Sequence, residues 1–364
     1  MKAIPFAILA VSSSLAVAPL CAQQARVVPS GLADIEGNLI STYPIGRTNG
    51  GLQIIADPNQ VASAPGFVLE AAFRVDGADP NLSYVGYTKQ YKLTVAQTTV
   101  TAAAMTTNPV TNHAGATPTI VFQQPLNIPS SSAQPTAPRP FSVRFPFNQT
   151  FPYDPNLGGL ILTLTTDDTT SVSPSWRLDG ASLRNDRPDG LVGALAPGCT
   201  GIGGAAMTLA VDATQLNFGG NLAATITSNT AGAFPLSAFL LGFQRQALDL
   251  TPLGMSGCTL GTTIDAALTV PEVGGVYAPV VLSIPNNPAL EGAPMFSQVL
   301  GVGTTPGSLT GSVVSNLLGL RIGNPAGHST WAQSMFTSDP NSTSWSLGRV
   351  GTFMPVLELT GILP

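Results

Sequence analysis

The chain has 364 residues, of which only 9% are charged, and its formal net charge is −5 at neutral pH. Ordinary globular domains contain about 25% charged residues, so Thr, Ser, Asn and Gln supply most of the polarity of this surface. Nucleic-acid binding depends on clustered Lys and Arg that neutralise phosphates. The sequence contains no such cluster, so we exclude a nucleic-acid partner.

The first 22 residues have the features of an export signal. An apolar run at 3–18 follows Lys2 and is too short to span a bilayer, which is typical of a signal-peptide core. We predict that residues 1–22 are a signal peptide cleaved after Ala22, which leaves 13 basic and 19 acidic side chains and a net charge of −6. A lipid anchor on Cys21 is the alternative, but Leu20 fits its requirement for a preceding small residue poorly. We expect an exported protein, extracellular or on the cell surface, without a membrane span.

Short alternating segments follow one another along the chain between turn signals. In "LILTL", Leu160, Leu162 and Leu164 share one face, while Ile161 and Thr163 share the other. The same period of two predicts strands in the segments 67–75, 91–95, 141–145, 207–211, 222–227, 239–243, 279–284, 317–322 and 355–359. No segment has the period of a long amphipathic helix, so the predicted fold class is all-β.

The sequence predicts two antiparallel β-sandwich or jelly-roll-like domains. Charge is concentrated in "SLRNDRPDG" at 182–190, in a chain that otherwise has little. We therefore place a linker at 186–194, between an N-terminal domain at 26–185 and a C-terminal domain at 195–364.

The tripeptide Asp-Pro-Asn occurs at 57–59, 79–81, 154–156 and 339–341. Asp and Asn side chains bond nearby backbone and Pro presets a turn dihedral, so we interpret these sites as turns. The pair Asp167 and Asp168 in "TTDDTT" is interpreted in the same way, as a hairpin loop. Calcium is the alternative ligand, but it requires six to eight converging oxygens. We expect no other cofactor.

Several segments resemble two modules of exported proteins from planctomycetes and other environmental bacteria. The N-terminal module is represented by "EGNLISTYPIGR" (36–47), "AAFRVDG" (71–77) and "FPYDPNLGGLILTL" (151–164). The C-terminal module is represented by "GCTG" (198–201), "FLLGF" (239–243), "LDLTPLGMSGCTL" (248–260) and "IPNNPALEG" (284–292), with Ser256 where the module has Pro. The resemblance implies secretion, β-architecture and a cysteine pair, and it transfers no activity.

The Gly-Cys-Thr triplet occurs twice, around Cys199 and Cys258. A zinc site requires three or four Cys or His ligands, and His113 and His328 lie far from both cysteines without ligand spacing. In an exported protein, two cysteines in matching turns most simply form a disulfide. We predict a Cys199–Cys258 bond that stabilises its domain by about 4 kcal/mol.

The sequence predicts no catalytic residue and no metal ligand. "AGHSTW" (326–331) lacks the second Gly and the strand-turn-helix context of a nucleophile elbow. His113 is interpreted as a solvated loop residue. Glycoside hydrolases need two facing carboxylates, but the glutamates scatter over both halves of the chain, at 36, 70, 272, 291 and 358. Asp249 and Asp265 are interpreted as surface turn residues beside the Cys258 turn.

Trp176, Trp331 and Trp345 lie in polar, loop-like segments. Two roles are open to each ring: if exposed, it could stack on a sugar, and if buried, it fills the end of a sandwich. We favour the buried role for any one of them. Lys89 and Lys92 are the only lysines after the signal, although lysine commonly protects exposed sheet edges, so self-association is also considered. We predict a non-catalytic, exported cell-surface or matrix protein that acts by binding or assembly, with surface polysaccharide or itself as partner. The alternatives are a carbohydrate-binding protein and a polysaccharide hydrolase or lyase.

Overall fold

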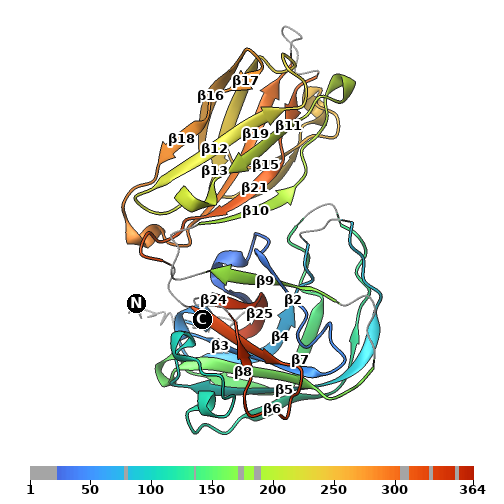
Figure 1. Cartoon of the computed structure of the whole chain (residues 1–364), viewed down its shortest axis with the longest axis vertical. Coiled ribbons are helices and arrows are strands. Elements are labelled where there is room, and N and C mark those ends of the chain that lie inside the picture. Colours follow the sequence, from blue (N-terminus) through green and yellow to red (C-terminus); the bar gives the residue numbers. More distant parts are fainter. Residues whose placement is uncertain are drawn as a thin grey trace, which may run out of the picture.

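The computed structural model describes residues 23–77, 81–134, 137–170, 176–183, 190–303, 311–327, 331–348 and 352–364. The predicted signal peptide at 1–22 lies outside these residues. Strand makes up 51% and helix 9% of the structure, which confirms the all-β fold class. Figure 1 shows two bodies, one above the other, joined near the middle of the picture.

The lower body, which we call the split domain, combines residues 23–183 with residues 331–364. Its smaller sheet has the order β1 (Gln24–Val28), β25 (Leu357–Ile362), β4 (Gly66–Phe73) and β7 (Val143–Tyr153). Its nine-stranded sheet has the order β2 (Leu39–Ser41), β9 (Leu178–Leu183), β24 (Thr352–Pro355), β22 (Ala332–Thr337), β3 (Gly50–Ala56), β8 (Gly159–Thr166), β5 (Tyr87–Thr98) and β6 (Thr119–Ile128), with β23 (Ser346–Leu347) on β22. The β22–β24 pair is parallel, and the other named pairs of both sheets are antiparallel.

The upper body, which we call the inserted domain, comprises residues 190–327. Its larger sheet has the order β10 (Leu191–Ala196), β21 (Leu317–Arg321), β19 (Pro294–Val302), β13 (Leu236–Gly242), β16 (Ala266–Val273) and β17 (Val276–Tyr277), with β20 (Val313–Val314) on β19. The facing sheet has β11 (Met207–Val211), β12 (Asn221–Ser228) and β18 (Val280–Ser283). A hairpin of β14 (Arg245–Asp249) and β15 (Thr259–Thr262) completes the domain.

Among the described residues, helices are confined to single turns. The α-helix is α1 (Pro58–Val61), and the 3-10 turns are η1 (Ser30–Leu32), η2 (Ala102–Ala104), η3 (Thr111–His113), η4 (Pro155–Leu157), η5 (Ile202–Gly204), η6 (Ala213–Gln215), η7 (Thr251–Leu253) and η8 (Pro288–Leu290). Over the described part of the chain, no helix has the length and apolarity that a membrane crossing requires.

The alternating pattern of the sequence determines which side chains enter each core. In β8, Leu160, Leu162 and Leu164 are buried in the core between the two sheets of the split domain, as predicted. Ile161 and Thr163 lie on the opposite face of the nine-stranded sheet. The strands of this sheet therefore present one apolar face to the core and a second face outward.

The predicted C-terminal domain, 195–364, is wrong in its last segment. Residues 332–362 pair with strands from the first part of the chain, because β22 pairs with β3 and β25 pairs with both β1 and β4. The alternating side chains of β25, including Leu357 and Leu359, complete the core of the split domain. The 190–327 segment is thus inserted between β9 and β22, and a pattern of strands along the chain does not reveal such long-range pairing.

The predicted linker at 186–194 is wrong in its second half. Residues 186–189 lie outside the described residues, but Leu191 already begins strand β10. Leu191 and Leu195 pack with Leu32 and Ile35 of the split domain in a shared apolar cluster at the junction. Two hydrogen bonds also cross it, from Ala137 N to Leu195 O at 3.0 Å and from the side chain of Arg321 to the Gly31 carbonyl at 2.5 Å.

Candidate functional site

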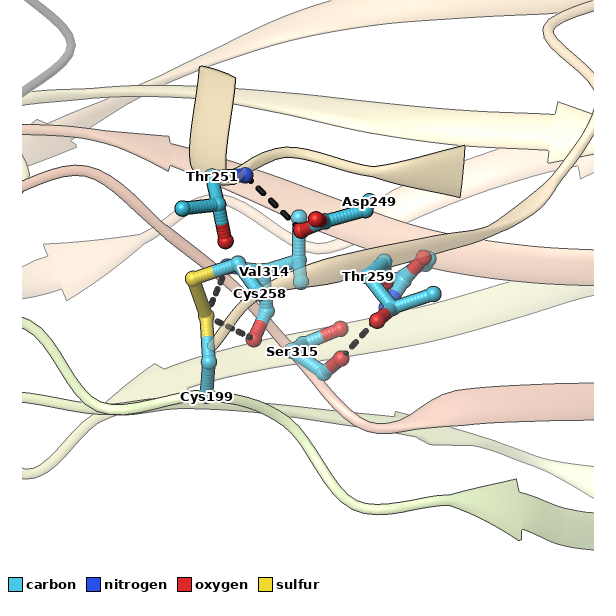
Figure 2. Close-up of a disulfide and its surroundings, with 8 residues drawn as sticks. Cys199, Asp249, Thr251, Cys258, Thr259, Val314 and Ser315 are labelled. Carbon is cyan, nitrogen blue, oxygen red and sulfur yellow. Dashed lines mark hydrogen bonds between the residues drawn. A yellow bond between two sulfur atoms is a disulfide. The ribbon is translucent and has the colours of Figure 1, made fainter. Parts of the chain in front are cut away.

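The predicted cysteine pair is confirmed. Cys199 and Cys258 form a disulfide with their Cα atoms 5.1 Å apart. Figure 2 shows the bond beside Val314, whose carbonyl accepts a hydrogen bond from Cys199 N at 3.0 Å. Cys258 and Val314 belong to an apolar cluster that joins the β14–β15 hairpin to the outer face of the larger sheet. The bond therefore has a structural role as a brace of the inserted domain.

Two of the three tryptophans are buried in the split domain. Trp176 is fully buried, its indole donates to the Val85 carbonyl at 3.0 Å, and its ring packs on Tyr84 with centroids 5.0 Å apart. Trp345 is 4% exposed and donates to the Ser342 carbonyl at 2.9 Å. The stacking prediction is wrong for both, because each indole fills the fold and its N–H is bonded internally.

Trp331 is half-buried at the junction, where it packs against the shared apolar cluster of the two domains. Its ring lies near Gly292 of the inserted domain, at 3.8 Å from the position of an added Cβ. The ring thus contacts both domains, and it is the only one of the three that reaches the surface in part.

Two of the four Asp-Pro-Asn sites are confirmed as turns, and the site at 57–59 instead begins helix α1. Asp154 Oδ1 accepts from the backbone and side-chain nitrogens of Asn156, both at 2.9 Å, and Asp339 Oδ1 accepts from Asn341 N at 3.0 Å. Asp57 Oδ1 instead accepts from Ala102 N at 2.8 Å. Asp79 and Pro80 of the fourth site lie outside the described residues. Each of these three carboxylates already accepts a hydrogen bond from a backbone N–H group, so the sites do not support calcium binding.

A network of buried charges lies below the junction. Arg74 donates to Asp179 Oδ2 at 2.6 Å through Nε, and Gly77 N donates to Glu36 Oε1 at 2.5 Å. The carboxylates of Glu36, Asp76 and Asp179 lie within 4.8 Å of one another, so they could supply three oxygen ligands to a metal ion. Calcium needs more oxygens than this, and the guanidinium already neutralises Asp179. We therefore assign the network to folding.

Burial changes the proton affinity of this network. Desolvation, reinforced by the negative charge of Asp179, raises the pKa of Glu36 to about 8. Desolvation also raises the pKa of Asp179, although Arg74 opposes that shift. Glu36 Oε2 has no hydrogen-bond partner in the described structure, which further disfavours its ionised form.

The remaining acid–base candidates are tied to the scaffold. Asp249 accepts from Thr251 N at 2.9 Å and Asp265 accepts from Phe243 N at 2.8 Å, so both are turn residues as predicted. Arg144 bridges the carboxylates of Glu70 and Glu358 from neighbouring strands. These two glutamates are brought together by the fold, which the sequence did not predict, and the guanidinium between them offsets their charge.

His113 is half-buried, and desolvation lowers its pKa, which differs from the predicted solvated loop. His328 and Ser329 lie outside the described residues.

A polar groove of about 340 Å³ lies on the outer face of the nine-stranded sheet. Its floor is made by β5, β8 and β6, and Pro340 and Asn341 contribute from a loop far along the chain. The strand register places Lys92 of β5 between Thr165 of β8 and Gln123 of β6. Cross-strand neighbours in a sheet have Cβ atoms about 5 Å apart, so these side chains form one continuous polar array.

The groove side chains have unused hydrogen-bonding capacity. Within the described structure, no hydrogen bond or ion pair engages the side chains of Gln90, Lys92, Thr94, Gln123, Thr165 and Asp167. They provide amide, hydroxyl, ammonium and carboxylate groups on adjacent strands. Such convergence of free polar groups in a concave site is what a polar ligand requires.

The groove is positioned by groups that are themselves fixed. Asp168 accepts from Gln90 N at 3.0 Å and from Thr170 N at 2.8 Å, and these bonds lower its pKa to about 2. Beneath the same end of β5, buried Lys89 donates to the carbonyls of Arg47 and Thr48, both at 2.7 Å. Internal bonds therefore hold the loops beside this end of the array.

Further along the same face, apolar loops cover the sheet. Ile161 and Ala96 pack there with Met335 and Trp345. Gln53 marks the border, because its Nε2 donates to Thr163 Oγ1 at 3.0 Å and to the Pro109 carbonyl at 3.1 Å. Only the uncovered end of the face is available to a ligand.

The sequence alone does not predict this groove. Asp167 has the pattern of a hairpin loop and Lys92 is an isolated lysine, although the alternation of β8 predicts that Thr163 and Thr165 face away from the core. The chain matches no protein-family model, no curated protein and no solved structure.

Proposed function

We propose that this chain is an exported protein of the cell surface or extracellular matrix, and that it acts by binding rather than by catalysis. The observation that carries this proposal is the groove, where five polar side chains on three adjacent strands, and Asp167 just after β8, have no partner in the described structure. The apolar segment at 3–18 and the disulfide support export.

The ligand class that we favour is carbohydrate. Sugar hydroxyls both donate and accept hydrogen bonds, and the groove offers both kinds of partner through its amides and hydroxyls. A hydrolase of the usual type needs two facing carboxylates. Among the described lining residues, Asp167 is the only carboxylate, so the groove favours binding over hydrolysis.

Binding to polysaccharides tests this proposal. The purified protein, residues 23–364, is incubated with insoluble polysaccharides and with a glycan array, and bound protein is quantified. We expect retention by at least one polysaccharide class, without release of soluble sugar. Failure to bind any glycan, or turnover of a bound polysaccharide, would contradict the proposal.

Self-assembly is a second candidate, favoured by the inserted domain. Val273 and Val276 of the β16–β17 hairpin are 75% and 67% exposed, and Leu248 of the β14–β15 hairpin is 52% exposed. Exposed apolar side chains favour association. Sedimentation velocity over a range of concentrations measures it, and a monomer at all concentrations would exclude this candidate.

A further inference from the structure

We propose that the groove binds a neutral oligosaccharide and that Lys92 is the residue that determines this specificity, an inference that rests on the proposed binding function. Lys92 occupies the centre of the polar array. Its cross-strand neighbours are Thr165 and Gln123, and Gln90 and Thr94 lie two residues away on the same face of β5.

The accessibility of Lys92 is unusual in this chain. It is one of two lysines after residue 22, and it is exposed on the groove floor. Lys89, three residues earlier, is 1% exposed and its ammonium donates to three carbonyl oxygens, those of Arg47, Thr48 and Thr170. The groove therefore contains the one lysine ammonium after residue 22 that is free to bind an external group.

The charges of the groove indicate a neutral ligand. Among the described lining residues, Lys92 is the single cation and Asp167 the single anion. Asp167 directly follows β8, two residues after Thr165, which is the cross-strand neighbour of Lys92. An anionic ligand would meet the carboxylate of Asp167, and a cationic ligand would meet the ammonium of Lys92. A neutral polyhydroxyl ligand accepts from one and donates to the other.

The dimensions of the array indicate more than a single sugar ring. Four residue steps separate Gln90 from Thr94, about 13 Å at the usual strand rise. The three strands span about 10 Å across the sheet. Because the array stands on strands, its backbone is already ordered before a ligand binds, and Asn341 and Pro340 line the same groove. The expected ligand is a di- or trisaccharide unit of a longer chain.

The test compares groove variants with matched controls on the same glycan panel. K92A removes the central ammonium, and T165V removes a neighbouring hydroxyl while keeping the side-chain shape. Arg245 and Thr227 are exposed positions of the inserted domain, so R245A and T227V are the controls for charge and for hydroxyl loss. Circular dichroism establishes that each variant is folded.

We expect K92A to weaken binding of a neutral glycan by roughly tenfold or more, since bonds to charged groups are the stronger ones. T165V should weaken it several-fold, and both controls should bind as the parent does. Binding should persist in 1 M salt, where the Debye length is about 3 Å.

Three results would overturn the inference. Unchanged glycan binding by both groove variants would place the site elsewhere while leaving the proposed function intact. Binding restricted to polyanionic glycans and lost in 1 M salt would exclude a neutral ligand. If the parent protein binds no glycan at all, the proposed function fails and this inference fails with it.

Discussion

The two domains stabilise similar β-architectures by different means. Among its described residues, the split domain buries six charged side chains, Glu36, Arg74, Asp76, Lys89, Arg139 and Asp179. In the described inserted domain, Arg321 at the junction is the only buried charged side chain, and a disulfide braces the outer hairpin. Small domains bury a smaller fraction of their surface and depend more on such cross-links.

This difference connects stability to the proposed site. In the split domain, hydrogen bonds between charged side chains and backbone fix the loops around a face that carries free polar side chains, as those of half-buried Asp168 and buried Lys89 do beside the groove. The inserted domain has its apolar core and its disulfide, and its exposed face carries apolar side chains. The predictions below test whether the two modes of stabilisation are independent.

The largest expected effect is loss of the disulfide. Replacing both Cys199 and Cys258 by Ala releases a loop closed over a sequence separation of 59 and should destabilise the inserted domain by about 4 kcal/mol. Urea unfolding measures the loss of stability. Far-ultraviolet circular dichroism is the signal, because the tryptophans belong to the split domain. Reductant should lower the stability of the parent protein and leave the double variant unchanged. Equal stability of parent and variant would show that the bond is not a brace.

Breaking the buried ion pair should have the next largest effect. Asp179→Asn leaves Arg74 charged without its counterion in a buried position and should lower the free energy of unfolding of the split domain by roughly 3 kcal/mol. Arg144→Ala is the control, because its pairs with Glu70 and Glu358 are partly exposed and should contribute less than about 1 kcal/mol. The two variants are compared by urea unfolding, and similar losses would contradict the assignment of the buried network.

The pH dependence of stability should also separate the domains. The pKa of Glu36 is raised from 4.5 to about 8, so the folded protein keeps a proton that the unfolded chain releases between these values. The free energy of unfolding of the split domain should therefore fall as pH rises from about 4.5 to about 8, by roughly 1 to 3 kcal/mol.

Glu36→Gln is the matched variant for this pH prediction. Its neutral amide should flatten the pH dependence of unfolding, which is followed by urea titration at several pH values. A slope that persists in the variant would assign the proton to another group.

Replacing groove side chains should affect stability least. Lys92→Ala and Thr165→Val remove side chains that have no internal hydrogen bond in the described structure, so each should change the free energy of unfolding by less than about 0.5 kcal/mol. Thermal unfolding measures the change against the parent protein. A loss above about 2 kcal/mol would show that these residues serve the fold instead of a ligand.

The sequence predicted elements better than their association. Alternation placed Leu160, Leu162 and Leu164 in a core, because this pattern is local in the sequence. The paired Gly-Cys-Thr turns predicted the disulfide, because two cysteines of an exported protein are expected to pair. The return of β25 to pair with β1 and β4 was not predictable, since strand pairing across most of the length of the chain leaves no local pattern.

The groove was hidden for the same physical reason. Lys92, Gln123, Thr165 and Asn341 come from four separate segments, and each alone resembles an ordinary exposed polar residue. For Trp176 and Trp345 the polar flanking residues left both an exposed and a buried role open, and the rings fill the interior. Register across the sheet brings the groove residues together, whereas the two tryptophans lie in segments outside the strands.

The most direct test of the account is nuclear magnetic resonance of lysine side chains. In residues 23–364, labelling with ¹³C-lysine gives ε-methylene signals from Lys89 and Lys92 alone, so the buried lysine is an internal control for the groove lysine. A bound neutral oligosaccharide should shift the Lys92 signal in proportion to saturation and leave the Lys89 signal in place. Saturating glycan that leaves the Lys92 signal unmoved would contradict the groove as the binding site.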